Sequence, residues 1–394
     1  DSKANMEIFP SSKNFSLPEP DKNSVKIAVK LLSSSKNPII LVGDRVSQYD
    51  AIKETVELAE QIGAGVYGHI STQVNFPTNH PQYLGKLPWS SVRDKNTIQK
   101  LNKADVIFAI GCPVFSDYFY VPKNPLNKNC KLIHLDINRS EIGKTESTEL
   151  GIHASPKKTL EILTKEISVN LSKEKIQIIN NRKNNHKKIT KKTYEEFEKL
   201  AISQSDKNPI GVAKMFKTIK EYLPTDCIIF DDSVSSGGML HSAIKFSEKN
   251  TYFGSRGGAI GWGMGSALGL KLSEPNKNVI AFLGDGTAMM TVQALWTSVN
   301  YKIPVVYIIC NNASYRVLKV NMNVYKEEVL NEKNYSSKYL NMDFPLPFDF
   351  CAIAKAFGAN GIRIEDTSKL GPAIENAIKS NQTTVIDVII NGEL

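Results

Sequence analysis

The sequence predicts an α/β protein built from two doubly wound parallel-sheet domains. Two parts of the chain, at 23–170 and 208–394, alternate short apolar runs with segments of helical periodicity, which is typical of parallel strands covered by helices. A stretch dense in Lys, Glu and Asn separates them at 171–207. With 394 residues, of which 41% are hydrophobic, the chain is long enough to form two hydrophobic cores.

The first domain is expected to follow a short polar segment. Residues 1–22 are interrupted by three prolines, so we expect them to form a linker from an upstream domain. The apolar run at 38–43 ends in a glycine and predicts a buried strand. A helix at 50–62 follows, because Ile52, Val56 and Ile62 share one helical face. Further strands are expected at 64–67, 104–110 and 131–135.

The second domain repeats this alternation after the charged stretch at 171–207, which we interpret as a solvated helical linker. Apolar, β-branched runs predict strands at 227–230, 279–283, 305–309 and 385–389. Helical periodicity predicts helices near 234–245, 259–271, 288–300, 348–357 and 368–379.

Charge and cysteine content argue against several classes of protein. The net charge of +9 is concentrated at 173–192 rather than spread over a binding face, so we expect no nucleic-acid partner. The five cysteines are widely spaced without a CxxC pair, which favours reduced core residues over disulfides or zinc. No apolar run is long enough to cross a membrane, and the N-terminus lacks a signal pattern. We therefore expect a cytoplasmic protein.

One segment carries the chemistry. The strand at 279–283 ends in Gly284-Asp285-Gly286, and the strand at 305–309 leads into Asn311-Asn312. A βαβ crossover brings such strands side by side, with both carboxyl ends at one edge of the sheet. Asp285 and Asn312 can then converge on one cation, and their oxygens suit Mg²⁺.

The same turn is suited to a phosphate group. Gly284 and Gly286 let the backbone approach a diphosphate closely. Thr287 opens the following helix, where a hydroxyl and the N-terminal amides can face anionic oxygens.

Together, Gly284-Asp285-Gly286 and Asn311-Asn312 resemble the cofactor motif of thiamine diphosphate enzymes. Other segments resemble the benzoylformate decarboxylase branch of that family, and the similarity begins near residue 24; these segments are 76–81, 110–115, 257–261, 267–275, 294–297 and 301–304. The resemblance implies a middle domain followed by a diphosphate-binding domain, with thiamine diphosphate and Mg²⁺ as cofactors.

The resemblance also assigns roles to individual residues. It implies that Mg²⁺ is held by Asp285, Asn312 and the carbonyl of Ser314. It implies diphosphate contacts from Ser235, Thr287 and the amide of Tyr315, beside Gly284 and Gly286. The carbonyl of Gly258 would accept a hydrogen bond from the aminopyrimidine, and Ile260 would be a buried prop beneath the bent cofactor, rigid because it is β-branched.

Two positions depart from the branch. A proton-transfer histidine is replaced at the aligned position by Tyr118, whose ordinary pKa near 10 suits proton transfer poorly at neutral pH. Val234 replaces a hydroxyl residue that faces the diphosphate, although Ser233, Ser235 and Ser236 lie beside it.

The resemblance implies decarboxylation or carboligation of a small 2-oxoacid. An acetolactate synthase-like carboligase and a non-catalytic cofactor-binding subunit remain open alternatives, as does flavin binding. In such enzymes a preceding pyrimidine-binding domain supplies a glutamate across a dimer interface. Because the middle domain is expected to begin by about residue 24, we expect this domain in cis or in trans, and a homo-oligomer when it is present.

Overall fold

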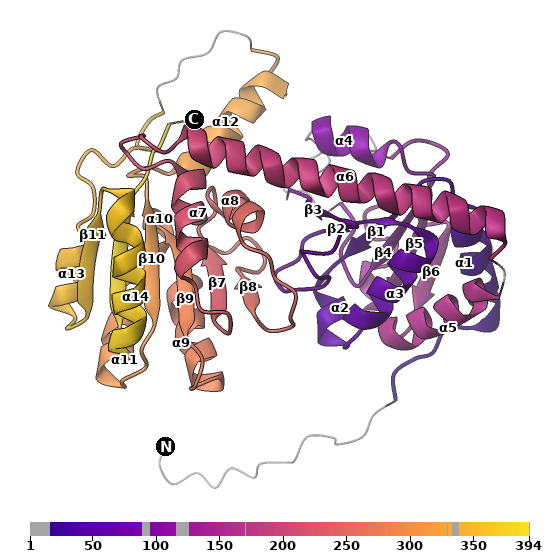
Figure 1. Cartoon of the computed structure of the whole chain (residues 1–394), viewed down its shortest axis with the longest axis horizontal. Coiled ribbons are helices and arrows are strands. Elements are labelled where there is room, and N and C mark those ends of the chain that lie inside the picture. Colours follow the sequence, from indigo (N-terminus) through magenta and orange to yellow (C-terminus); the bar gives the residue numbers. More distant parts are fainter. Residues whose placement is uncertain are drawn as a thin grey trace, which may run out of the picture.

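Two α/β lobes lie side by side and are joined by one long helix (Figure 1). The structure is a computed structural model that describes residues 16–88, 95–115, 126–169, 171–328, 330–332 and 339–393. Each lobe contains a six-stranded sheet, and every strand pair in both sheets is parallel. The predicted fold class is therefore confirmed.

The first sheet has the strand order β3-β2-β1-β4-β5-β6. Its strands are β1 (Pro38–Val42), β2 (Gly65–Gly68), β3 (Tyr83–Lys86), β4 (Val106–Ile110), β5 (Lys131–Asp136) and β6 (Leu150–His153). The helices around it are α1 (Lys22–Ser34), α2 (Asp44–Gln48), α3 (Ile52–Ile62), α4 (Lys95–Leu101) and α5 (Pro156–Ser168), with a short 3₁₀ turn η1 (Arg139–Glu141). Every residue of β1 and β4 is buried, because both strands pair on two sides.

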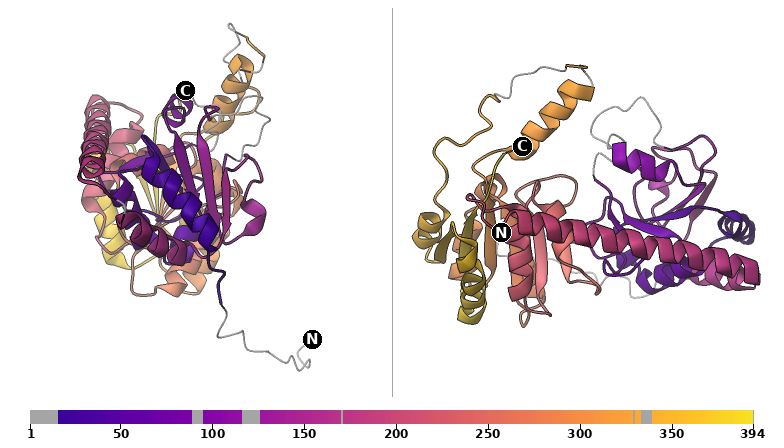
Figure 2. Two further views of the ribbon diagram at one scale, coloured as in Figure 1. Left: turned by 90° about the vertical axis from the view of Figure 1, so that its right-hand side faces the viewer. Right: turned by 45° about the horizontal axis from the view of Figure 1, so that its top comes forward.

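Helix α6 (Lys173–Ser203) connects the lobes and packs on both. It begins after Ser172, whose hydroxyl accepts a hydrogen bond from the amide of Lys175 at 3.3 Å. In Figure 1 and in the right-hand view of Figure 2 it extends across both lobes. Most of it is exposed, which accounts for its polar composition; Ile179 is buried near its start, and Phe197 and Ala201 near its end.

The second sheet has the order β11-β12-β10-β9-β7-β8. Its strands are β7 (Ile228–Asp232), β8 (Tyr252–Gly254), β9 (Val279–Gly284), β10 (Val306–Asn311), β11 (Asn360–Ile364) and β12 (Thr384–Ile389). The helices are α7 (Val212–Tyr222), α8 (Gly237–Ala243), α9 (Gly263–Ser273), α10 (Asp285–Met290), α11 (Ala294–Asn300), α12 (Arg316–Glu328), α13 (Phe350–Ala356) and α14 (Leu370–Ser380), with a 3₁₀ turn η2 (Thr367–Lys369).

One predicted helix is divided in the structure. The helix expected at 288–300 forms two helices, α10 and α11, separated by residues 291–293. The hydroxyl of Thr291 donates to the carbonyl of Gly261 at 2.7 Å, so the break ties this turn to the segment that precedes α9.

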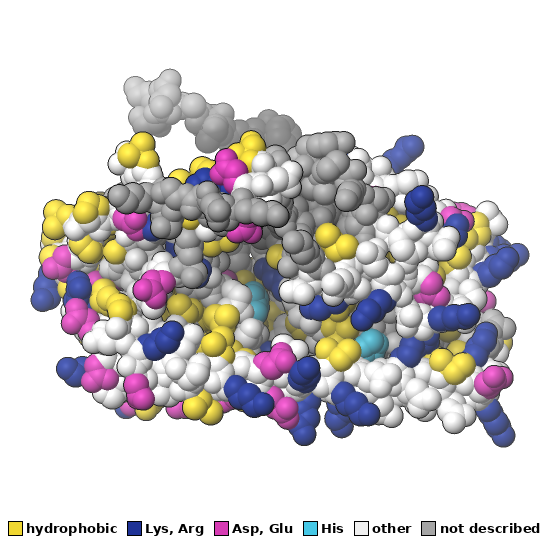
Figure 3. All heavy atoms as spheres, turned by 90° about the horizontal axis from the view of Figure 1, so that it is seen from above, with side chains coloured by type: hydrophobic (Ala, Val, Ile, Leu, Met, Phe, Trp, Pro, Cys, Tyr) yellow, Lys and Arg dark blue, Asp and Glu magenta, His cyan; other side chains and the backbone are white. Residues whose placement is uncertain are grey.

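The described residues contain no helix that is both long and apolar enough to cross a membrane. On the face drawn in Figure 3, Lys and Arg side chains are dispersed, with Asp and Glu among them. The five cysteines are free thiols.

Candidate functional site

The structure brings Asp285 and Asn312 together at the carboxyl edge of the second sheet. Strands β9 and β10 are adjacent, with Gly284 opposite Cys310, so the residues that follow each strand are neighbours. The amide of Asn312 donates to Oδ2 of Asp285 at 3.1 Å. The convergence expected from the βαβ crossover is therefore observed.

The carboxylate of Asp285 is buried without a cationic partner. The residue is 3% exposed, and within the described part of the chain no Lys or Arg pairs with it. Burial raises the pKa of Asp285, opposed by backbone amides that include those of Gly286 and Ala313. A buried carboxylate without a cationic partner is costly, so this position would favour a cation, and carboxylate and amide oxygens are of the kind that Mg²⁺ prefers.

The turn after β10 presents the other expected metal ligands. Ala313 has a φ of 51°, a left-handed conformation that reverses the chain. Oδ1 of Asn312 accepts a hydrogen bond from the amide of Ser314 at 3.0 Å, which fixes the amide side chain beside Asp285. The roles of Asn312 and of the Ser314 carbonyl as ligands remain predictions.

The expected diphosphate groups lie around the same edge. A Cβ on Gly286 would come within 2.9 Å of the Tyr315 ring, so this glycine permits a close approach. The Thr287 hydroxyl lies within hydrogen-bond distance of two carbonyls, those of Gly284 at 2.8 Å and Asp232 at 3.0 Å. It therefore braces the ends of β7 and β9, and contact with a diphosphate would compete with this role.

Tyr315 is held by a segment far along the chain. Its amide donates to the carbonyl of Met342 at 2.8 Å, so the expected contact with a diphosphate requires this bond to be exchanged. The amide of Phe344 in turn donates a hydrogen bond to the carbonyl of Ala313 at 2.8 Å. Its ring packs edge-on against Tyr315 with centroids 4.7 Å apart.

A cleft of about 270 Å³ opens beside these residues. Its lining includes Ser235 and Asn312, together with two basic residues that the sequence analysis did not single out, Lys207 and Arg316. Arg316 opens α12, and its Nε donates to the carbonyl of Glu393 at 2.9 Å. A cation is unfavourable at a helix N-terminus unless an anion lies nearby. A basic residue directly after Tyr315 was therefore a sequence signal of an anion-binding site.

The turn after β7 contains Val234, the residue that replaces a hydroxyl residue of the benzoylformate decarboxylase branch. Val234 has a φ of 50°, a strained conformation for a β-branched residue. Ser235 follows it and lines the cleft, whereas Ser233 points inward and donates to Oδ1 of Asp231 at 2.6 Å. Ser235 is therefore the better placed hydroxyl for an anion in the cleft.

The segment expected to face the aminopyrimidine forms a glycine-rich turn before α9. Gly257, Gly258 and Gly261 all have positive φ, between 67° and 93°. Oδ2 of Asp232 accepts bonds from the amides of Gly261 and Gly263, both at 3.1 Å. Asp232 thus anchors this turn, a role the sequence analysis missed although an acid at the end of a strand was a signal.

Ile260 differs from the expectation of a buried prop. It is 42% exposed, because the turn lifts it away from the core. The role of Ile260 beneath the cofactor therefore stays a prediction. Because the side chain is exposed, its burial contributes little to the stability of the chain. Tyr118 lies outside the described residues.

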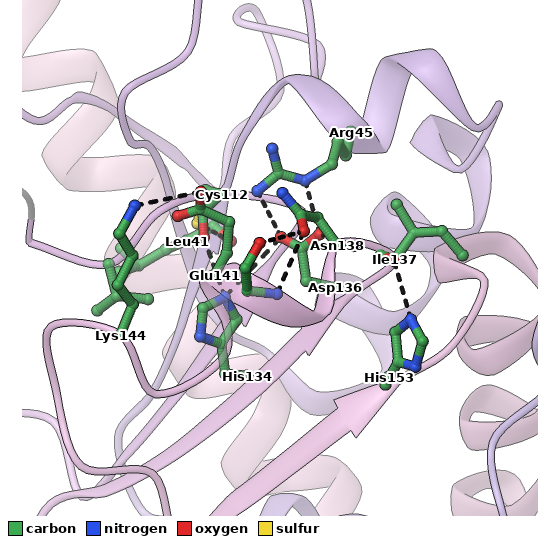
Figure 4. A network of polar contacts seen from close by, with 12 residues as sticks. Leu41, Arg45, Cys112, His134, Asp136, Ile137, Asn138, Glu141, Lys144 and His153 are labelled. Atoms are coloured by element: carbon green, nitrogen blue, oxygen red, sulfur yellow. Dashed lines mark hydrogen bonds and ion pairs between the residues drawn. The ribbon is translucent and has the colours of Figure 1, made fainter.

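A separate polar network occupies the carboxyl edge of the first sheet (Figure 4). Arg45 forms two 2.6 Å bonds to Asp136, which is completely buried. His134 lies beneath, with Nε2 3.0 Å from the carbonyl of Cys112. A Cβ on Gly43 would lie 2.4 Å from the Cβ of Cys112. The ends of β1 and β4, between which the strand order reverses, are thus tightly packed.

Comparison with known proteins agrees with this architecture. Residues 25–163 match the family described as thiamine pyrophosphate enzyme, central domain, and residues 232–388 match thiamine pyrophosphate enzyme, C-terminal TPP binding domain. The chain is 28% identical over 378 residues to the "Probable acetolactate synthase large subunit" of Methanococcus aeolicus, covering 93% of this chain and 60% of that protein.

Two decarboxylases are also similar. Benzoylformate decarboxylase of Pseudomonas aeruginosa is 25% identical, with 91% of this chain and 62% of that protein covered. The structure of a thiamine diphosphate-dependent 4-hydroxybenzoylformate decarboxylase from Rhodococcus jostii RHA1 superposes with a TM-score of 0.76 at 26% identity, covering 97% and 66% of the two chains. The chain thus spans about 60% of the length of the curated relatives it matches.

The two family matches, the paired sheets and the site at the ends of β9 and β10 agree with one another. The chain belongs to the thiamine pyrophosphate enzymes, of which it carries the central domain and the C-terminal TPP-binding domain.

Proposed function

We propose that this chain is the cofactor-binding part of a thiamine diphosphate- and Mg²⁺-dependent enzyme that decarboxylates, or ligates after decarboxylation, a small 2-oxoacid. The observation that carries the proposal is the buried carboxylate of Asp285, which has no cationic partner among the described residues and lies against Asn312. A divalent cation bound to a diphosphate would neutralise it.

Each part of the site has a role in this proposal. When bound, thiamine diphosphate supplies the carbon nucleophile and the electron sink for loss of carbon dioxide. Asp285, Asn312 and the Ser314 carbonyl would hold Mg²⁺. Ser235 would bind the diphosphate together with the Gly284–Thr287 turn and the Tyr315 amide. Gly258 and Ile260 would orient the aminopyrimidine.

We further propose that a pyrimidine-binding domain completes the site, in cis or in trans, within a homo-oligomer. The aminopyrimidine side of the site supports this, because Ile260 and Trp262 are 42% and 50% exposed there. Large apolar side chains grouped at an open site usually have a partner surface. The match to only about 60% of the curated relatives is consistent with the same proposal.

An acetolactate synthase-like carboligase is the second candidate, favoured by the similarity to the Methanococcus aeolicus protein. We infer a flavin-free enzyme in either case. Ligands of doubly wound sheets bind where the strand order reverses, and in the first sheet that place, between β1 and β4, is tightly packed by Gly43 and Cys112 beside the Arg45–Asp136 pair. Visible flavin absorbance in the purified protein would overturn this inference.

Product analysis separates the candidates. The chain, alone and supplemented with a pyrimidine-binding domain, is incubated with Mg²⁺, thiamine diphosphate and either pyruvate or benzoylformate. The proposal expects product only from the supplemented protein: an aldehyde and carbon dioxide from a decarboxylase, acetolactate from a carboligase. Asp285→Ala is the matched inactive control. Cofactor binding without any product in the supplemented protein would favour a non-catalytic subunit.

A further inference from the structure

A loop of the first domain is organised by one carboxylate, that of Asp44 at the start of α2. Oδ1 of Asp44 accepts bonds from the amide of Thr72 at 2.7 Å, from the amide of Gln73 at 3.0 Å and from Nδ2 of Asn75 at 3.0 Å. Oδ2 accepts the Thr72 hydroxyl at 2.5 Å. Four bonds to one side chain fix the conformation of the loop at 72–75.

This loop pairs with the second domain. Gln73 and Phe253 form an antiparallel bridge, and the amide of Gly254 donates to the carbonyl of Thr72 at 2.8 Å. Strand β8 is the last strand of its sheet, next to β7. The loop therefore covers the edge of β8 that faces away from the sheet, as a further short strand would.

Strand β8 leads directly into the turn proposed to face the aminopyrimidine. Only Ser255 and Arg256 lie between Gly254 and the Gly257–Gly258 pair. Nε of Arg256 donates to the Thr72 hydroxyl at 3.3 Å and lies 3.9 Å from Oδ2 of Asp44. The far end of the turn is fixed within its own domain by Asp232. The near end is held on two sides: within its own domain by the pairing of β8 with β7 and by the amide of Ser255, which donates to the carbonyl of Asp231 at 3.2 Å, and across the domain interface by the loop at 72–75.

We propose that Asp44 of the central domain is a positioning residue for the cofactor-binding turn at 257–260. The carboxylate fixes the loop at 72–75, the loop fixes β8 and Arg256, and these set the place of Gly258 and Ile260. The inference rests on the proposed function for the identity of the ligand, but not for the mechanical link. It assigns the central domain a direct part in shaping the site.

The test compares two substitutions at the same domain interface. Asp44→Ala removes the carboxylate that organises the loop. Lys249→Ala removes a second interdomain ion pair of the described residues, Lys249 with Asp50, which lies on the exposed rim. Asp44→Asn is the conservative variant, because its amide oxygen can still accept the bonds from Thr72, Gln73 and Asn75.

Hydrogen exchange of the 394-residue chain without cofactor tests the mechanical link. Amides at 254–261 are expected to exchange about tenfold faster in Asp44→Ala, since a link of roughly 1.4 kcal/mol is lost. Lys249→Ala should match wild type, and Asp44→Asn should restore most of the protection. Unchanged exchange at 254–261 in Asp44→Ala would overturn the inference, and so would equal acceleration in Lys249→Ala.

Cofactor affinity tests the functional consequence. Titration of Mg²⁺ and thiamine diphosphate, followed by tryptophan fluorescence, to which Trp262 beside the turn contributes, should give a dissociation constant roughly tenfold higher in Asp44→Ala than in Lys249→Ala. Equal constants would overturn the positioning role. If wild type binds no cofactor, the proposed function fails, whereas the exchange result still decides whether Asp44 holds the turn.

Discussion

At the residue scale, the proposed site depends on a carboxylate that no Lys or Arg of the described residues neutralises. Asp285 is buried and surrounded by backbone amides, and burial raises its pKa. Amide dipoles help to hold the charge but do not neutralise it. A buried carboxylate whose negative charge is energetically unfavourable therefore lies where Mg²⁺ is proposed to bind.

Removing this carboxylate should eliminate metal-dependent cofactor binding. Changes in the outer shell of metal sites typically cost about 10–100-fold in affinity, so loss of the charged ligand in Asp285→Ala should exceed roughly 100-fold. Isothermal titration calorimetry with thiamine diphosphate and Mg²⁺ measures this. Glu375→Ala, which removes an exposed carboxylate on α14, is the control. Equal affinities in both variants would contradict the role of Asp285.

Ile260→Ala should separate function from stability. The side chain is 42% exposed, so truncation should cost less than about 1 kcal/mol of unfolding free energy. If Ile260 props the cofactor, turnover of the complete enzyme should fall substantially at saturating thiamine diphosphate. Urea unfolding and steady-state assays measure the two effects. Wild-type turnover in the variant would exclude the role.

Asp387 predicts a pH dependence of stability. It is buried in β12, bonded to Nδ2 of Asn311 at 2.9 Å, and burial raises its pKa to about 6. The folded state therefore holds a proton that the unfolded state has lost above about pH 4. Stability contributed by this group is present at low pH and is lost as pH rises from about 4 to about 6.

In the variant Asp387→Asn, the unfolding free energy should not show this decrease between about pH 4 and about pH 6. The difference in unfolding free energy between wild type and variant should change by about 3 kcal/mol across that pH window, with wild type losing stability relative to the variant as pH rises. Thermal unfolding at several pH values measures it. Parallel pH profiles for the two proteins would show that Asp387 does not titrate there.

At the element scale, the central strands could be predicted from the sequence and the edge strands could not. The four strands absent from the prediction, β3, β6, β8 and β11, are the outer strands of the two sheets. Edge strands are partly exposed, so they lack the continuous apolar runs that revealed β1, β4, β9 and β10. Helices α10 and α11 were merged because only a tertiary bond from Thr291 marks their break.

The site residues that follow central strands could be predicted from the sequence, whereas those in loops could not. Asp285 and Asn312 follow central strands, and adjacent parallel strands place their carboxyl ends together regardless of detail. Arg316 and Lys207 reach the site from the start of α12 and from a loop, whose geometry has no fixed spacing in the sequence. Asp232, by contrast, ends strand β7, and its position was a signal that the sequence analysis did not use. The exposure of Ile260 likewise depends on the three positive-φ glycines around it.

Helix α6 should depend on one arginine for its attachment to the first domain. Arg182 donates to the carbonyls of Ser35 and Lys36, each at 2.9 Å, and of Ile62 at 2.6 Å. Arg182→Ala leaves these carbonyls without that donor and should lower the unfolding free energy by about 2 kcal/mol. Lys187→Ala, on an exposed position of α6, should have little effect. Equal denaturation midpoints would contradict the attachment.

At the scale of the whole molecule, the two domains are in contact beside the proposed cofactor site. Helix α6 packs on both domains, and the loop at 72–75 meets β8 across the interface. On the face drawn in Figure 3, Lys and Arg side chains are dispersed among Asp and Glu and form no continuous basic patch. A bound diphosphate with Mg²⁺ would occupy the cleft, lie near Arg316 and neutralise the carboxylate of Asp285.

The most direct measurement is a calorimetric titration of the 394-residue chain with thiamine diphosphate, in the presence of Mg²⁺ and again with a chelator. The account predicts weak, saturable binding of one cofactor per chain with Mg²⁺ and its loss when the metal is removed, because Asp285 and the diphosphate repel each other without a shared cation. Absence of binding in the presence of Mg²⁺, or equal affinity in the chelator, would contradict it.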